Sequence, residues 1–268
     1  HFSTLFDMET MDPLISGKPF VKALDELTAA QSQMPAAALA ASPRDVHEAF
    51  LNGRCGLALT WTSAAWGAAG ADDAVVAAAQ PVGEKTLEVG CGELPGSPEA
   101  FNPKSRQWDS RRDDEASRVP LVGVSGRLAS VTAQSEHADA AFKLLAWLAG
   151  PQWSRRISTS SGATTLFRRS QVAAGGEWAD ERLGPAGALA YGETVERTLS
   201  AAESFGAPRI AGRDRYLAAL DRAVRDAVTG KLASKAALER AGDEWRSITA
   251  ELGLDRQRAA YRRSLGLR

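Results

Sequence analysis

The residue types that carry most enzyme and metal chemistry are few in this chain, or they lack the spacing that such chemistry needs. The three histidines, His1, His47 and His137, form no metal-ligand motif such as HExxH, and neither of the two cysteines has a CxxC partner. The sequence also contains no GxSxG elbow, Walker A loop or GxGxxG fingerprint. We therefore expect no structural zinc site and no cofactor.

The acidic and serine residues give no stronger indication of catalysis. The carboxylate pairs Asp72-Asp73 and Asp113-Asp114 lie in polar stretches, whereas general acid catalysis needs a carboxyl group whose pKa is raised by burial. Gly123-Val124-Ser125-Gly126 superficially suggests a serine nucleophile, but no helix start follows it closely. These patterns favour a protein that is not an enzyme.

Tryptophan is the residue type that stands out. Of the seven tryptophans, Trp61, Trp66 and Trp108 lie outside any helical stripe, and Trp61 is followed by Thr62 and Ser63. A sugar has an apolar C–H face and a polar rim, so an indole beside hydroxyl groups is suited to bind it. The alternative is that Trp61 packs in a hydrophobic core.

Composition and charge exclude other broad classes. The chain has 268 residues and a net charge of -1, which argues against a surface devoted to nucleic acid. No apolar run reaches the ~18 residues of a membrane-spanning helix. The arginines of the C-terminal region alternate with Asp221, Asp226, Glu239, Asp243 and Glu244, which predicts ion pairs on helix surfaces.

Hydrophobic periodicity and capping residues predict several helices. One covers Lys18–Ala30, a second starts at Pro43 after the N-cap Ser42, and a third covers Glu136–Ala149 with Ser135 as its cap. Two more helices end at Gly230 and Gly253. Their expected buried stripes are Leu217, Leu220, Val224 and Val228 in one helix, and Leu238, Ala241, Trp245, Ile248 and Leu252 in the other.

Short apolar runs predict strands between these helices. The expected strands are Cys55–Trp61, Thr86–Cys91, Pro120–Val124 and Arg127–Thr132, and the polar stretch Asn102–Arg118 is expected to be a surface loop. Cys55 and Cys91 fall in the first two strands, where they form either a disulfide or two buried free thiols. Strands interspersed with helices predict an α/β fold, and the irregular spacing favours two lobes.

Several segments, in this order along the chain, resemble the sugar-binding family of ABC transporter solute-binding proteins, which includes maltose-binding protein. They include an F-x-x-G segment with a following strand and tryptophan loop, an "LPG" turn, a crossing strand, an "A-A-x-x-F-x-x-W-L" helix and a C-terminal helical signature. The corresponding residues are Phe50–Arg54 and Gly56–Ser63, Leu94–Gly96, Val122–Val131, Ala140–Leu148, Pro208–Ile210, Tyr216-Leu217, Ala227–Gly230, Ala237-Leu238 and Trp245.

This resemblance implies a periplasmic-binding-protein-like α/β fold of type II with two lobes joined by hinge crossings. Residues 1–119 and 207–268 would belong to the C-terminal lobe, and residues 120–206 to the N-terminal lobe and the crossings. A full member is longer, so the resemblance also implies that part of the N-terminal lobe is missing. The location implied is periplasmic or otherwise extracytoplasmic, with or without a lipid anchor.

The function implied is the substrate-binding component of an ABC-type uptake transporter, which binds a sugar or oligosaccharide between its lobes and docks on a membrane permease. No nucleic-acid partner is expected. The alternatives are a peptide, polyamine or anion as ligand, a glycan-processing enzyme, or a truncated interaction module. The candidate ligand-binding residues are Trp61, Thr62, Ser63, Trp66, Trp108, Ser125, Arg127, Thr164, Thr165, Arg168 and Arg209.

Overall fold

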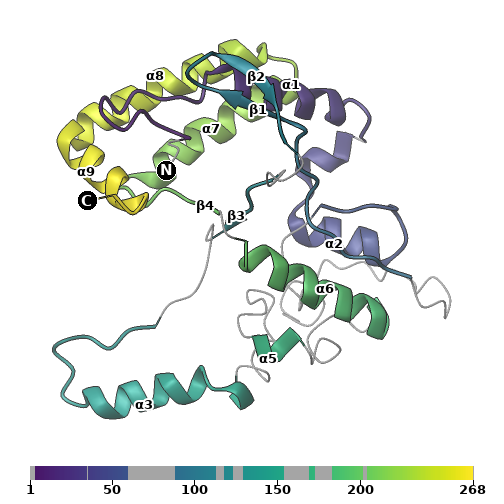
Figure 1. The fold of residues 1–268 in the computed structure, drawn as a ribbon, viewed down its shortest axis with the longest axis vertical. Helices are drawn as coiled ribbons and strands as arrows, with labels where there is room; N and C mark the ends of the chain where they lie inside the picture. Colours follow the sequence, from purple (N-terminus) through teal and green to yellow (C-terminus); the bar gives the residue numbers. More distant parts are fainter. Residues whose placement is uncertain are drawn as a thin grey trace. The chain divides into compact units, whose positions relative to one another are not determined.

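The computed structural model describes residues 4–34, 36–59, 88–112, 118–122, 129–153, 169–172, 183–201 and 204–267. Helices dominate this part of the chain (Figure 1). The helices are α1 (Lys18–Gln31), the 3₁₀ helix η1 (Ala36–Ala40), α2 (Pro43–Leu51), α3 (Ala138–Leu148), α5 (Arg169–Val172), α6 (Gly184–Leu199), α7 (Arg213–Val228), α8 (Ser234–Leu252) and α9 (Leu254–Ser264). The strands are β1 (Glu99–Asn102), β2 (Gln107–Ser110), β3 (Leu121–Val122) and β4 (Phe205–Gly206).

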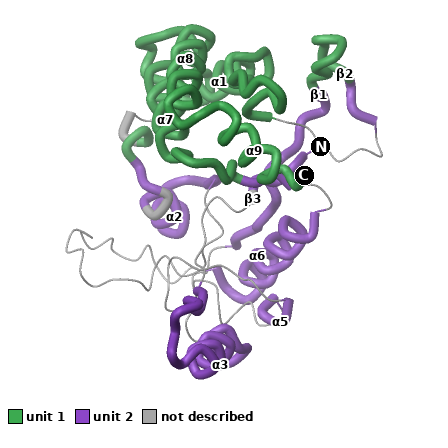
Figure 2. The backbone as a smooth tube through the Cα atoms, turned by 90° about the vertical axis from the view of Figure 1, so that its left-hand side faces the viewer, with its two compact units in different colours: residues 1–40, 101–109, 207–268 green, residues 41–100, 110–206 purple. Residues whose placement is uncertain are grey.

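The chain divides into two units, and each gathers segments that are far apart in the sequence (Figure 2). Unit 1 contains residues 1–40, 101–109 and 207–268, and unit 2 contains residues 41–100 and 110–206. The polypeptide therefore passes from one unit to the other at four points.

The framework of unit 1 is the helix pair α7 and α8, against which α1 packs. The buried residues of α8 include Leu238, Ala241, Trp245 and Ile248, as the sequence predicted, while Leu252 is only half-buried. The two expected helix ends are confirmed, because Gly230 follows α7 and Gly253 follows α8, both with positive φ.

The buried face of α7 differs from the predicted one. The predicted stripe contained Leu217, Leu220, Val224 and Val228, whereas the structure buries the residues that precede each of them: Tyr216, Ala219, Ala223 and Ala227. Both sets have the same helical spacing, so periodicity alone could not separate them. Three of the four buried residues are alanines, which allow the backbones of two helices to approach closely, and the larger side chains flank that contact.

Phe6 is the centre of the unit 1 core. Its ring stacks on Trp245 at a centroid distance of 4.8 Å and meets Tyr216 and Tyr261 edge-on at 5.4 and 5.3 Å. The Tyr261 hydroxyl accepts hydrogen bonds from the backbone N–H groups of Leu5 and Phe6, each at 3.4 Å. Leu5 and Phe6 are both buried, so the segment that precedes α1 contributes to this core.

The segment expected to be a surface loop, Asn102–Arg118, contains a strand, so that part of the prediction is wrong. β2 pairs with β1 in a two-stranded sheet. The connection includes Arg106 at a φ of 57°, and its carbonyl accepts a hydrogen bond from Lys18 Nζ at 3.4 Å. Phe101 and Trp108 supply the aromatic contact between the strands, with ring centroids 5.4 Å apart.

Unit 2 has a smaller set of buried apolar residues among its described parts: Leu51, Leu183, Ala188 and Val195. The N-terminus of α2 matches the prediction, because the Ser42 side chain accepts from the Asp45 N–H while Asp45 accepts from the Ser42 N–H. A short parallel pair joins β3 to β4, with Leu121 opposite Phe205 and Val122 opposite Gly206.

Several predicted strands are not strands where the structure describes them. Cys55–Leu59, Glu88–Cys91 and Ala129–Thr132 have no strand conformation, and among the described residues of Pro120–Val124 a strand is formed by Leu121 and Val122 but not by Pro120. The remaining residues of these predictions lie outside the described part of the chain. A short apolar run favours burial of a segment, but it does not identify the neighbouring segment with which a strand must pair.

The helix predicted at Glu136–Ala149 is α3, which begins at Ala138 without a side-chain cap. Ala141, Phe142, Leu145 and Leu148 recur along α3 at the spacing that is typical of a buried helix face. The structure buries no residue of α3, and Phe142 is 66% exposed. Trp147 is 53% exposed and contacts the ring of Trp153 at a centroid distance of 4.7 Å.

Candidate functional site

Two of the eleven predicted ligand-binding residues, Trp108 and Arg209, lie in the described part of the chain. Both belong to unit 1. The other nine lie outside the described residues: Trp61, Thr62, Ser63, Trp66, Ser125, Arg127, Thr164, Thr165 and Arg168.

Trp108 lies on β2 and is half-buried. One of its contacts is the Lys22 ammonium group of α1, whose nitrogen lies 4.3 Å from the centre of the indole ring. A cation at this distance is attracted to the negative face of the ring. Lys22 therefore covers part of the surface that a sugar would need for stacking, and Trp108 also holds the β1–β2 sheet against α1.

Arg209 is exposed and lines an open groove that precedes and includes the start of α7. One of its terminal nitrogens donates to the carbonyl of Ser264 at 3.4 Å. The groove has a volume of about 480 Å³, and its lining combines two buried apolar residues, one glycine and four charged residues. The lining residues are Pro208, Arg209, Ile210, Gly212, Arg213, Asp214 and Arg215.

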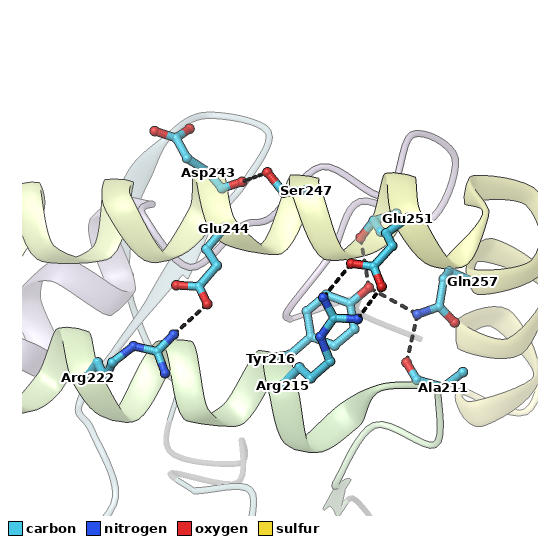
Figure 3. Close-up of polar contacts among 10 residues, drawn as sticks. Ala211, Arg215, Tyr216, Arg222, Asp243, Glu244, Ser247, Glu251 and Gln257 are labelled. Carbon is cyan, nitrogen blue, oxygen red and sulfur yellow. Dashed lines mark hydrogen bonds and ion pairs between the residues drawn. The ribbon is translucent and has the colours of Figure 1, made fainter.

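Two of the three arginines in this groove have carboxylate partners. Arg215 forms two parallel hydrogen bonds with Glu251, at 2.8 and 2.5 Å, and these bonds raise the pKa of Arg215 and lower the pKa of Glu251 (Figure 3). Nε of Arg213 donates to the Asp214 carboxylate at 3.2 Å. Arg209 has no carboxylate partner among the described residues, so its charge is the one left without a counter-ion in the groove.

A buried hydrogen-bond network lies behind the groove and fixes its backbone. The side-chain amide of Gln257 donates to the carbonyl of Ala211 at 2.8 Å and to the hydroxyl of Tyr216 at 3.0 Å (Figure 3). That hydroxyl also bonds Thr249 Oγ1 at 2.9 Å, and the indole N–H of Trp245 donates to the Tyr216 carbonyl at 2.8 Å. The groove therefore has a rigid base, since these side chains are buried and joined to one another.

A second polar cluster lies in unit 2, and the sequence analysis did not anticipate it. The Glu93 carboxylate is mostly buried and pairs with Arg118 and with Arg197, the latter at 3.5 Å. Arg197 also donates to the Thr194 hydroxyl at 3.0 Å, and that hydroxyl donates to the carbonyl of Cys91 at 3.2 Å. These contacts tie α6 to the segment before β1, and the approach of Arg118 and Arg197 to Glu93 had no signal in the local sequence.

The two cysteines are not bridged, which decides between the two alternatives left open by the sequence. Cys55 and Cys91 are both half-buried in unit 2, and burial raises the pKa of the Cys91 thiol. A thiol with a raised pKa is protonated at neutral pH and is a poor nucleophile. Cys91 instead packs near α6, with its sulfur 3.9 Å from the carbonyl of Gly187.

Among the described residues, no group of histidine, cysteine, aspartate and glutamate side chains could hold a metal ion. In the same part of the chain, no helix is both long and apolar enough to cross a lipid bilayer. The ion pairs predicted for the C-terminal helices are confirmed: Arg225 with Asp221, Arg240 with Asp226, Lys235 with Glu239, Arg246 with Asp243, and Arg222 with Glu244.

No protein-family model matches this chain, and no curated protein sequence matches it.

Proposed function

We propose that this protein is the substrate-binding component of an ABC-type uptake transporter and that its ligand is a sugar or an oligosaccharide. The main support is the discontinuous division of the chain, which passes between two units at residues 40, 100, 109 and 206. The points at residues 100 and 109 fall within the strands of the β1–β2 hairpin, so the connections suited to a hinge motion are those at residues 40 and 206.

The ordered segments that resemble the sugar-binding family add to this support. The chemistry proposed for the ligand depends on Trp61, whose indole would stack on a sugar ring, and on the hydroxyls of Thr62 and Ser63, which would bond the ring substituents. Closure would remove the ligand from water, and its binding energy would shift the balance between open and closed forms toward the closed form. The closed form would then dock on a membrane permease.

Calorimetric titration of the whole chain tests this proposal. The panel contains neutral mono- and oligosaccharides, and its comparison arms are a short peptide, spermidine and inorganic phosphate. We expect binding heat with at least one saccharide and none with the comparison ligands. Heat with spermidine, the peptide or phosphate alone would replace the sugar with another solute, and hydrolysis of a saccharide during the titration would identify a glycan-processing enzyme.

A pair of tryptophan variants makes the test specific to the site. Trp61→Ala should weaken saccharide binding about tenfold or more, because stacking on an indole contributes ~1–3 kcal/mol in comparable ring contacts. Trp147→Ala is the matched control, since it removes an indole that is 53% exposed on α3 and has no assigned role in binding. If both variants bind as tightly as the unaltered protein, the role given to Trp61 is wrong.

A further inference from the structure

The groove beside Arg209 carries an excess of positive charge at one defined place. Arg213 and Arg215 are each bonded to a carboxylate, whereas the guanidinium of Arg209 is bonded to one backbone carbonyl, at 3.4 Å. A guanidinium has five N–H donors arranged as a planar fork that matches a carboxylate. Most of the donors of Arg209 are therefore available to a ligand on the exposed side of the groove.

The other lining residues fit a polyhydroxylated ring better than a bare anion. Pro208 and Ile210 also line the groove, but both are buried, so the groups that it offers a ligand are chiefly polar, as suits the hydroxyls of a sugar. The Asp214 carboxylate is exposed, and as an ionised group it accepts hydrogen bonds from hydroxyls. Nε of Arg213 lies 3.2 Å from this carboxylate, and its positive charge offsets the repulsion between Asp214 and an anionic ligand. The volume of about 480 Å³ lies within the range of ~300–1,000 Å³ that is usual for small-molecule sites.

We propose that the ligand is an acidic saccharide, such as a uronic acid or its oligomers, whose carboxylate binds the Arg209 guanidinium in the groove Pro208–Arg215. This inference rests on the proposed function and narrows the class of its substrate. A neutral sugar would use the Asp214 carboxylate but would leave the charge of Arg209 unmatched. The rigid base formed by Gln257, Tyr216 and Thr249 keeps the groove in shape before the ligand arrives.

The test compares matched ligands and matched variants by calorimetry on the whole chain. The ligands are galacturonate oligomers, neutral galactose oligomers of equal length, and citrate as an anion that is not a sugar. The variants are Arg209→Gln, which removes the unmatched charge, Arg209→Lys, which keeps the charge but loses the fork, and Arg222→Gln. Arg222 pairs with Glu244 outside the groove, so its variant controls for a general loss of positive charge.

We expect the galacturonate oligomer to bind at least about tenfold more tightly than the neutral oligomer, since a hydrogen bond to a charged group is worth ~1.5–3 kcal/mol. Arg209→Gln should abolish this preference, Arg209→Lys should keep only part of it, and Arg222→Gln should leave it unchanged. Because Arg209 is exposed, the variants should fold normally, and circular dichroism spectra and melting curves check this.

The other outcomes separate a failure of this inference from a failure of the proposed function. Equal binding of acidic and neutral oligomers, or a preference that survives Arg209→Gln, overturns the inference and leaves a sugar receptor. If citrate binds, this binding is lost in Arg209→Gln, and no saccharide binds, then the groove is an anion-binding site. This outcome overturns the proposed sugar function. The absence of binding by all three ligands overturns both.

Discussion

At the scale of single residues, Phe6 illustrates how one side chain joins the two ends of unit 1. Its ring is enclosed by Tyr216, Trp245 and Tyr261, which come from three different C-terminal helices. The segment around it is held at its edges as well. Glu9 accepts from Arg258 through its carbonyl at 3.1 Å, and from Arg262 through its carboxylate at 2.6 Å. The contribution of Phe6 to stability should therefore be large.

We expect Phe6→Ala to lower the free energy of unfolding of unit 1 by about 3–5 kcal/mol, the usual cost of removing a fully buried aromatic ring. Urea unfolding followed by the fluorescence of tryptophan measures this change. Phe142→Ala is the matched control because Phe142 is 66% exposed on α3, and its loss should cost less than about 1 kcal/mol. Similar costs for the two variants would show that the ring of Phe6 is not held in the aromatic cluster.

At the scale of elements, two glycines with the same backbone conformation have different surroundings. Gly212 precedes α7 at a φ of +70°, and Gly230 follows it at +74°. A methyl group on Gly212 would lie 2.6 Å from Cδ1 of Leu252, whereas one on Gly230 would meet no atom within 4 Å. The pair therefore separates the cost of backbone conformation from the cost of crowding.

We expect Gly230→Ala to destabilise unit 1 by about 1 kcal/mol, since a left-handed residue with a side chain costs ~1–2 kcal/mol. Gly212→Ala should cost about 1 kcal/mol more, because Leu252 must move out of its packed position. Melting temperatures of the two variants, measured side by side, give the comparison. Equal losses would mean that Leu252 moves aside without losing contacts.

The helices were more predictable from the sequence than the strands. Lys18–Ala30 and the capping residue Ser42 were identified correctly because periodicity and caps are local signals. The β1–β2 sheet was missed because its strands are short and polar, with Phe101 and Trp108 as the aromatic pair between them. On α7 the predicted spacing of the buried residues was correct, but the predicted buried face was wrong. The small side chains of the alanines determine which face of the helix packs against its neighbours.

The candidate site was less predictable than the fold elements. Arg209 was identified from the family resemblance, but the groove around it depends on Arg213, Asp214 and Arg215, whose partners include residues as distant as Glu251. These pairings leave Arg209 as the arginine of the groove without a carboxylate partner among the described residues. No local sequence motif predicts this difference. The role of Lys22 over Trp108 could not be predicted either, because the two residues come from different segments of the chain.

At the scale of the whole molecule, buried apolar residues are distributed unevenly over the described elements. α8 contains eight buried residues, whereas α3 has none, although α3 is the more apolar helix. Amide hydrogens exchange slowly where a helix opens only with the rest of the core. The two helices should therefore differ strongly in their exchange rates.

We expect the amides of α8 to exchange at least about a hundredfold more slowly than those of α3 at neutral pH, which corresponds to a difference in opening free energy of ~3 kcal/mol or more. Hydrogen–deuterium exchange followed by mass spectrometry resolves peptides from both helices. Equal protection of α3 and α8 would show that α3 is covered in solution, and would contradict its exposure in the structure.

The bond between the Phe6 backbone and the Tyr261 hydroxyl spans 255 positions of the sequence, and this separation has a consequence for biosynthesis. A ribosome adds roughly 5–20 residues each second, so the segment around Phe6 waits on the order of tens of seconds before Tyr261 is synthesised. During that delay Phe6 and its neighbours remain apolar and uncovered. The aromatic cluster around Phe6 therefore forms only after Tyr261 has been synthesised, and until then the ring of Phe6 is exposed on the nascent chain.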